Sequence, residues 1–211
     1  AWGYDTPLLY GSEGAAQEAV DAFKSTLNIN EAGGDTVDER IELSPQPQTS
    51  VVVMDQYTGQ VKAIIGGRGE KNSSLSLNRA TDSARQPGSC FKILSAYAPA
   101  LNEGKITLAT TIDDEEYEYI GPTRVRYGIE HSMNVLAVKT LTDYVGETES
   151  YDYLLNFGFT TLSEDDKYSQ AKALGGITNG VYNIEMTAAY AAIANGGTYT
   201  KPILYTQVLD H

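Results

Sequence analysis

The sequence predicts an α+β domain, in which helices pack against a sheet. Residues 50–65 combine two short β-branched runs with turn residues between them, which is typical of a β-hairpin. Several later segments repeat apolar residues at helical spacing and end at glycine. Residues 30–48 are polar and contain two adjacent glycines and two prolines, so they indicate a linker or boundary before this domain.

Composition narrows the possible functions. The chain has 211 residues, with 15 Lys and Arg against 28 Asp and Glu, and a formal net charge of −13. Nucleic acids and anionic membrane surfaces need a basic face, so neither is an expected partner. One cysteine, Cys90, excludes an internal disulfide framework, and two separated histidines argue against a histidine metal centre.

The N-terminal elements are a helix and a hairpin. Residues 12–27 carry apolar side chains at helical spacing after Ser12, which can cap the helix. A short strand is expected at residues 40–43. Val51–Met54 and Val61–Ile65 then form the hairpin strands. Their continuous apolar runs predict a sheet covered on both faces by helices.

The rest of the chain is predicted to be mainly helical. A helix opens at Pro87-Gly88 and ends near Gly104, with a kink or shifted boundary at Pro99. An acidic loop, residues 113–119, follows it. Further helices are expected at residues 132–145, 148–157 and 183–194, the last capped by Asn183, and a strand or extended edge at residues 198–209.

The segment Ser89-Cys90-Phe91-Lys92 can carry covalent chemistry. Residues three apart on a helix face the same side. A serine hydroxyl becomes a good nucleophile when a base takes its proton, and lysine can do so if burial lowers its pKa. Because Pro87-Gly88 places Ser89 at a helix start, free N–H groups there favour negative charge on a carbonyl oxygen under attack.

The spacing S-x-x-K alone has little specificity, since Ser169-Gln170-Ala171-Lys172 repeats it. That copy lacks a Pro-Gly start and is interpreted as a solvated helix end.

A second motif is Ser132-Met133-Asn134. It can direct a hydroxyl and an amide into one cleft, where the hydroxyl relays a proton and the amide holds a substrate carbonyl. Helix capping by Ser132 is the alternative.

Taken in order, these motifs resemble the transpeptidase domain of class A penicillin-binding proteins, the bifunctional, high-molecular-weight group. The resemblance covers roughly residues 48 to 210. It rests on the hairpin from Val51 to Gly67, Asn78-Arg79-Ala80, Arg85-Gln86-Pro87-Gly88-Ser89-Cys90-Phe91-Lys92, Ser132-Met133-Asn134-Val135, Leu174-Gly175-Gly176, Met186-Thr187-Ala188-Ala189-Tyr190-Ala191, Asn195-Gly196-Gly197-Thr198-Tyr199 and Lys201-Pro202.

The resemblance implies the fold shared with serine β-lactamases, an antiparallel sheet flanked by helices. It also implies that Ser89 attacks a D-Ala-D-Ala stem peptide of peptidoglycan, that Lys92 takes its proton, and that Ser132 protonates the leaving amine. Asn134 would hold the substrate backbone and help fix Lys92. β-Lactam antibiotics would acylate Ser89, no metal or organic cofactor is implied, and the parent protein would be anchored at the extracytoplasmic face of a bacterial membrane.

One departure from the family pattern is the third motif, K-T-G, which does not occur in this sequence. We therefore expect residues 1–48 to be a linker before the domain and residues 49–211 to be its N-terminal two-thirds. The missing C-terminal part would be a partner, and the 211-residue chain alone would have little activity. A non-catalytic β-lactam receptor or wall-binding module, and a serine β-lactamase, are the alternative functions.

Cys90, His131 and three tyrosines lie near the motif residues in sequence or in the loop that follows them, and their expected roles are mainly structural. Cys90 is expected to be a half-buried filler beside the nucleophile. His131 can line the cleft, with capping or simple exposure as the alternatives. Tyr117, Tyr119 and Tyr127 can rim the cleft or pack on the surface, and the acidic residues around them read as a solvated loop rather than a cation site.

Overall fold

The computed structural model describes residues 9–29, 33, 43, 45–69, 71, 74–114 and 121–209. They belong to two compact units, residues 1–48 with 68–72, and residues 49–67 with 73–211. The first unit contains α1 (Glu13–Ser25), and the Ser12 hydroxyl caps it by accepting a hydrogen bond from the Ala15 N–H at 3.2 Å. The strand expected at residues 40–43 lies outside the described residues apart from Leu43.

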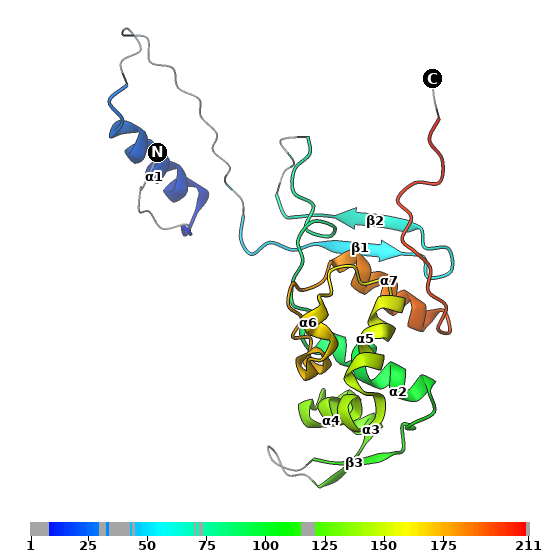
Figure 1. The fold of residues 1–211 in the computed structure, drawn as a ribbon. Coiled ribbons are helices and arrows are strands. Elements are labelled where there is room, and N and C mark those ends of the chain that lie inside the picture. The colour runs from blue at the N-terminus through cyan, green and yellow to red at the C-terminus, as the bar shows by residue number, and fades with distance from the viewer. Residues whose placement is uncertain are drawn as a thin grey trace. The chain divides into compact units, whose positions relative to one another are not determined.

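The second unit contains a hairpin, a short second hairpin and a set of helices (Figure 1). Its described elements are β1 (Val51–Met54), β2 (Val61–Ile65), η2 (Gly88–Cys90), η3 (Ile93–Tyr97), α2 (Ala98–Asn102), β3 (Thr111–Asp113), β4 (Pro122–Arg124), α3 (Val125–Glu130), α4 (Asn134–Lys139), η4 (Thr140–Val145), α5 (Glu147–Asn156), α6 (Glu164–Lys167), η5 (Gln170–Leu174) and α7 (Asn183–Ala194).

The predicted hairpin is confirmed. β1 and β2 are antiparallel, with Val51 opposite Ile65. The Asp55 side chain accepts hydrogen bonds at 2.9 Å from the backbone N–H groups of Tyr57 and Thr58, which hold the turn in shape and keep the pKa of this carboxyl below its usual value. Turn chemistry in the sequence therefore fixed the register of this hairpin.

The prediction that helices cover both faces of the hairpin is wrong for the described residues. α7 packs against β1 and lies along one face, as Figure 1 shows. On the two strands, Val51, Val53 and Ile65 are 45%, 51% and 54% exposed. Apolar runs do not distinguish a strand covered on both faces from one whose second face is uncovered, which explains the error.

One continuous helical run carries the predicted nucleophile. It starts with the 3-10 turn η2, passes through the π-helical turns of η3 and ends in α2. Pro99 does not break it but lies in the first turn of α2. A proline has no N–H to donate to the Ser95 carbonyl four residues earlier, and the Ser150 hydroxyl donates to that carbonyl instead, at 2.6 Å.

This helical run crosses three buried clusters. Phe91 and Leu94 belong to the first cluster, Ala96 to the second and Tyr97 to the third. The Phe91 ring meets the Phe159 ring edge to face at 5.1 Å. Burying one such aromatic side chain contributes about 2 to 3 kcal/mol. The run is therefore held on several sides, and side chains along it have fixed positions.

Other helices follow the sequence with shifted boundaries. The helix expected at residues 132–145 is α4 continued by η4, and the one at 148–157 is α5. α7 spans the predicted 183–194, but Asn183 is its first residue and not its cap; the Asn183 side chain donates to Ser50. The short elements β3, β4, α3 and α6 were not predicted, because three to six residues show no clear period.

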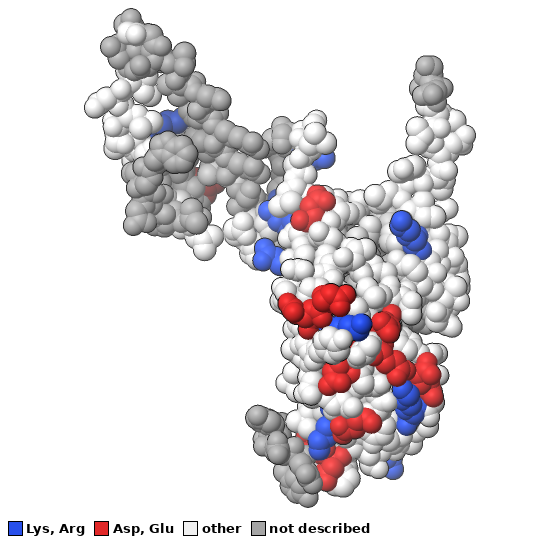
Figure 2. Space-filling model, viewed as in Figure 1, with Lys and Arg blue, Asp and Glu red and all other residues white. Residues whose placement is uncertain are grey.

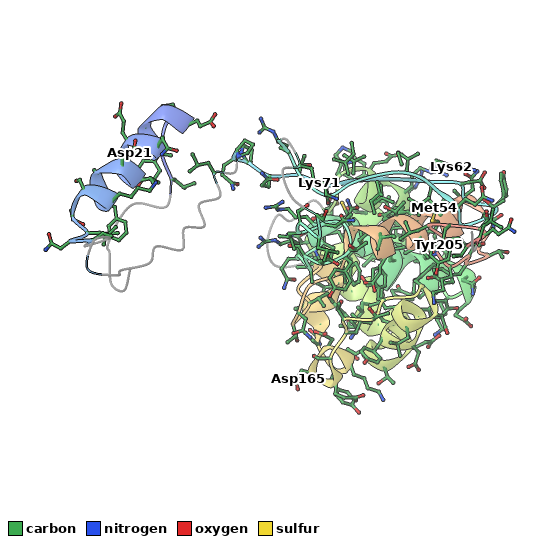
Figure 3. All side chains as sticks on the ribbon, turned by 90° about the horizontal axis from the view of Figure 1, so that it is seen from above. Asp21, Met54, Lys62, Lys71, Asp165 and Tyr205 are labelled. Carbon is green, nitrogen blue, oxygen red and sulfur yellow. The ribbon has the colours of Figure 1, made fainter. Side chains whose placement is uncertain are left out.

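The expected strand at residues 198–209 is reduced to one bridge. Ile203 pairs with Gln60 in parallel, and the Val61 N–H donates to the Ile203 carbonyl at 2.9 Å. Figure 3 labels Met54 on β1, Lys62 on β2 and Tyr205 just beyond this bridge. The last described segment therefore lies against the hairpin turn without forming a strand of its own.

Charge on the second unit is mixed in sign. On the face that Figure 2 shows, acidic side chains lie over the helical part of this unit with basic ones between them. Within this unit, Lys105 and Glu149 form an ion pair of 2.7 Å. Both partners are about one-third exposed, so the pair contributes little to stability.

Candidate active site

Ser89 lies at the middle of the 3-10 turn η2 and is exposed. Gly88 before it has φ +57°, a conformation that glycine adopts without steric cost. Among the described residues, none forms a hydrogen bond with the Ser89 hydroxyl. This hydroxyl is therefore open to a ligand, at the start of a helical run as predicted.

Lys92 lies three residues further along the same run and is only 2% exposed. Its ammonium group donates to the Asn134 Oδ1 at 2.6 Å, to the Ser132 Oγ at 3.0 Å and to the Ser132 backbone carbonyl. Burial lowers the pKa of Lys92, because the charged form loses its hydration. A lowered pKa makes the neutral amine, which can accept a proton, easier to reach.

Ser132 is held in an unusual backbone conformation. Its φ is +51°, in the left-handed region that residues with a Cβ rarely adopt. The Ser132 N–H donates to the Ile129 carbonyl at 3.1 Å, and the next N–H, that of Met133, donates to the Gly128 carbonyl at 2.9 Å. These bonds offset a conformational cost of about 1 kcal/mol. The strained turn aims both oxygens of Ser132 at Lys92.

The alternative role of Ser132 as a helix cap is not what the structure shows. The residue before α4 is Met133, and no side chain caps the helix. The Ser132 hydroxyl instead contacts the Lys92 ammonium. Both Ser132 and Asn134 are exposed, so they reach the surface at the loop-to-helix junction while sharing one buried lysine.

Three of the four predicted site residues are thus joined by direct hydrogen bonds. Lys92, Ser132 and Asn134 meet although 40 residues separate the two segments. Ser89 precedes Lys92 by three residues on the same helical run. The arrangement places an exposed hydroxyl three residues before an amine of lowered pKa, with a second hydroxyl bonded to that amine, and acyl transfer through a serine ester uses groups of these kinds.

The second S-x-x-K copy is not the solvated helix end that its sequence suggested. Lys172 is completely buried, and its ammonium group donates to the backbone carbonyls of Asp166, Lys167 and Ser169 at 2.8 to 3.1 Å. The Ser169 hydroxyl accepts a hydrogen bond from the Ala171 N–H. Three carbonyls on one turn attract a buried cation, a feature of backbone geometry that residue spacing does not reveal.

The structure describes Cys90, His131 and Tyr127, but not the other two tyrosines that were expected near the cleft. Cys90 is exposed, so the prediction of a half-buried filler is wrong. His131 is exposed and stacks on the Tyr127 ring, with 3.8 Å between ring centres, while its Nδ1 lies 3.0 Å from the Tyr127 carbonyl. Residues 115–120, including Tyr117 and Tyr119, lie outside the described residues.

Sequence reasoning missed Gln86 and Gly175 as contacts of the Ser89 turn. Gln86 hydrogen-bonds the backbone of Ile177, and Gly175 lies directly against Gly88. Both residues lie in segments on which the family resemblance rests, residues 85–92 and 174–176, but no contact between these segments was predicted. Within the part of the chain that the structure describes, no group of three or more His, Cys, Asp or Glu side chains could hold a metal ion.

Comparison with known proteins shows which family this chain belongs to. The family model "Penicillin binding protein transpeptidase domain" matches residues 49–211. The chain is 35% identical over 187 residues to penicillin-binding protein 1A of Clostridium botulinum, covering 78% of this chain and 22% of that protein. It is also 35% identical over 218 residues to penicillin-binding protein 1A of Clostridium novyi, covering 93% and 24%. The chain spans about a quarter of the length of these curated relatives.

Solved structures show the same fold. The penicillin-binding protein PonA1 from Mycobacterium tuberculosis superposes with a TM-score of 0.61 over 75% of this chain and 46% of that chain, at 23% identity. A peptidoglycan synthase complex matches with a TM-score of 0.52 over 78% of this chain and 40% of that chain, at 20% identity. At these identities the likeness concerns the fold alone, and the predicted α+β fold is confirmed.

Proposed function

Because this chain belongs to the penicillin-binding protein transpeptidase family, we propose that it carries the acylation site of a peptidoglycan D,D-transpeptidase. Ser89 is the nucleophile, Lys92 the base, Ser132 the proton relay and Asn134 a substrate-binding and orienting residue. The substrate is a stem peptide that ends in D-Ala-D-Ala, and β-lactam antibiotics acylate the same serine.

In the acylation step, the Ser89 Oγ forms a bond with the carbonyl carbon of the penultimate D-Ala, and the Ser89 proton moves to the neutral amine of Lys92. The backbone N–H of Ser89 donates to the oxygen that becomes negative. The bond to the terminal D-Ala nitrogen then breaks. Lys92 returns the proton to this nitrogen through the Ser132 hydroxyl, and the separation of 3.0 Å between the two groups suits such a relay.

In the second step, the amine of a neighbouring stem peptide attacks the ester carbonyl. A new amide bond forms, the bond between carbon and the Ser89 Oγ breaks, and the Ser89 oxygen regains a proton that the amine gives up. The product is a peptide cross-link between glycan strands, and the serine is free for another cycle. No metal or organic cofactor takes part in this scheme.

The observation that carries the proposal is the contact set of Lys92. A buried lysine has a high cost unless its charge is compensated or its neutral form is used. Here the compensating oxygens come from Ser132 and Asn134, two side chains that also reach the surface. A lysine with a purely structural role would not need partners that are exposed to a substrate.

In this proposal the chain acts at the extracytoplasmic face of a bacterial cell membrane, where stem peptides are cross-linked. Among the described helices, none is long and apolar enough to cross a membrane. Its partners are stem peptides and the part of the transpeptidase domain that supplies a K-T-G strand, which anchors the substrate carboxylate and adds an oxyanion donor. Removing one such donor costs about 3 kcal/mol of transition-state stabilisation, so the 211 residues alone should acylate slowly.

Labelling with a fluorescent penicillin tests the acylation step. The full-length gene product should become labelled, Ser89→Ala should abolish the label, and Ser169→Ala, which alters the other S-x-x-K copy, should keep it. Release of D-Ala and cross-linking of a stem peptide then separate the candidate functions. Labelling without D-Ala release indicates a β-lactam receptor, rapid loss of the label indicates a β-lactamase, and no label on the wild type contradicts all three.

A further inference from the structure

The turn that carries Ser89 is attached to the segment 175–181. The Arg85 N–H donates to the Val181 carbonyl at 3.0 Å, and the Val181 N–H donates to the Arg85 carbonyl at 2.9 Å. At the next residue, Gln86, the side chain and not the backbone makes the hydrogen bonds to this segment. The Gln86 Oε1 accepts from the Ile177 N–H at 2.7 Å, and its Nε2 donates to the Ile177 carbonyl. Gln86 thus pairs with both backbone groups of one residue, 91 positions away in sequence.

Two glycines bring the same segment into backbone contact with the turn. Gly175 has φ +81°, and a Cβ at this position would lie 2.5 Å from the Gly88 nitrogen and 2.7 Å from the Gly88 carbonyl carbon. Gly180 has φ +73°, and its Cβ would lie 2.6 Å from the Arg85 carbonyl carbon. Any larger residue would push the turn outward. The contact at Gly88 matters most, because the next peptide nitrogen is the N–H of Ser89.

A third attachment comes from α7 on the C-terminal side of the nucleophile. The Tyr190 hydroxyl donates to the Cys90 carbonyl at 2.7 Å. The exposed Ser89 therefore lies between anchored neighbours, with Gln86 and Gly88 before it and Cys90 after it. A three-residue 3-10 turn has few hydrogen bonds of its own, so these outside contacts define its position.

We infer that Gln86 and Gly175 are positioning residues for acyl transfer, fixing the place of the Ser89 hydroxyl and the direction of the Ser89 N–H. The inference rests on the proposed function. Displacing a reacting group by about 1 Å can cost about 100-fold in rate, while substrate binding changes little. Neither residue forms a hydrogen bond with Lys92, and both contact backbone groups, so their effect should appear in the acylation rate constant and not in the affinity.

Matched variants separate positioning from general damage. Gln86→Met keeps the side-chain length but removes both hydrogen bonds to Ile177. Its control is Gln48→Met, because Gln48 makes the same pairing with Arg68 in the first unit, accepting from the Arg68 N–H at 2.9 Å and donating to the Arg68 carbonyl at 3.3 Å. Gly175→Ala has the control Gly104→Ala, since Gly104 has φ +65° with no atom within 4 Å of a Cβ.

The experiment measures acylation by a fluorescent penicillin in the full-length gene product over a range of concentrations. We expect the limiting rate constant to fall about 10-fold for Gln86→Met and about 100-fold for Gly175→Ala, with the half-saturating concentration unchanged and both controls within about twofold of the wild type. Amide hydrogen exchange should become faster in residues 85–92 of the two test variants and stay at the wild-type rate elsewhere.

Three outcomes overturn the inference. Wild-type limiting rates in both test variants show that the contacts do not position the nucleophile. Faster exchange throughout the chain, or equal losses in the controls, attributes the effect to global destabilisation. Absence of label on wild-type Ser89 defeats the proposed function and this inference together, whereas a labelled wild type with unaffected variants defeats the inference alone.

Discussion

The chain contains two serine-lysine pairs of identical spacing, and their surroundings differ. Lys92 and Lys172 are both buried, 2% and 0% exposed, and burial lowers the pKa of both. Lys92 directs its ammonium group at two side chains and one carbonyl. Lys172 directs its group at three backbone carbonyls.

The serines differ in the same way. The Ser169 hydroxyl is occupied in capping η5, where it accepts from the Ala171 N–H at 3.2 Å. The Ser89 hydroxyl has no such partner among the described residues and is exposed. In one pair both side chains bond to nearby backbone groups, and in the other the lysine bonds to Ser132 and Asn134 while the serine hydroxyl stays open to a ligand. Spacing alone therefore does not distinguish the two serine-lysine pairs; the partners of the lysine do.

Replacing each lysine by methionine should give the largest difference between the two pairs, in acylation rate and in the free energy of unfolding. Lys92→Met should lower the acylation rate by about 1,000-fold, because the base is lost, with a change in unfolding free energy below about 1 kcal/mol. Lys172→Met should remove the ammonium donor from three carbonyls, of which that of Asp166 keeps the N–H groups of Tyr168 and Ser169 as donors, and cost about 2 kcal/mol of stability. Penicillin labelling and urea unfolding measure the two effects. A destabilised Lys92→Met that still acylates normally would reverse the assignment.

The pH dependence of stability should single out Lys172. Burial lowers its pKa from 10.5 to about 8, a shift that the nearby carboxylates of Glu147 and Asp166 oppose. Between these values the unfolded chain binds more protons than the folded chain, so the free energy of unfolding rises with pH. From about pH 7.5 to about pH 10, the wild type should gain about 2 kcal/mol relative to Lys172→Met. Urea unfolding at both pH values measures this, and a constant difference would contradict it.

Placing a charge beside Lys92 should shift its titration. In Asn134→Asp, a carboxylate replaces the amide oxygen that lies 2.6 Å from the ammonium group, and it raises the pKa of Lys92. Less neutral amine is then available, so acylation near neutral pH should fall about 10-fold and recover as the pH is raised. Asn156→Asp, which adds the same charge at the end of α5, should have the wild-type pH profile. An unshifted profile for Asn134→Asp would argue against Lys92 as the base.

The smallest expected effect is that of Ser169→Ala. Loss of the cap on η5 should reduce the free energy of unfolding by about 1 kcal/mol and leave the acylation rate unchanged. Thermal unfolding and penicillin labelling of the same preparation give both numbers. A loss of acylation without a loss of stability would mean that Ser169, and not Ser89, takes part in the chemistry.

Much of the fold followed from local sequence signals. The hairpin was predictable because Asp55 and Gly59 specify its turn, and the longer helices because their apolar residues recur at helical spacing. β3 and β4 were not predictable, since three-residue strands have no measurable alternation. The prediction that helices cover both faces of the hairpin was wrong because the residues of a strand do not specify which element packs against it.

The candidate site was also predictable only in part. Ser89, Lys92, Ser132 and Asn134 were found as two short motifs, and the structure brings the last three into contact. The burial of Lys172 depends on three carbonyls whose directions only the folded backbone defines. The contact of Gly175 with Gly88 joins positions far apart in the sequence, and no local pattern predicts it.

The most direct test of the central claim is to locate the acyl group. The full-length gene product is treated with a penicillin, digested with trypsin and analysed by mass spectrometry. Cleavage after Arg85 and Lys92 yields a peptide, residues 86–92, with one serine and the exposed Cys90. The account predicts an ester on Ser89 and an unmodified peptide around Ser169; an adduct on Cys90, on Ser169 or on no residue of this chain would contradict it.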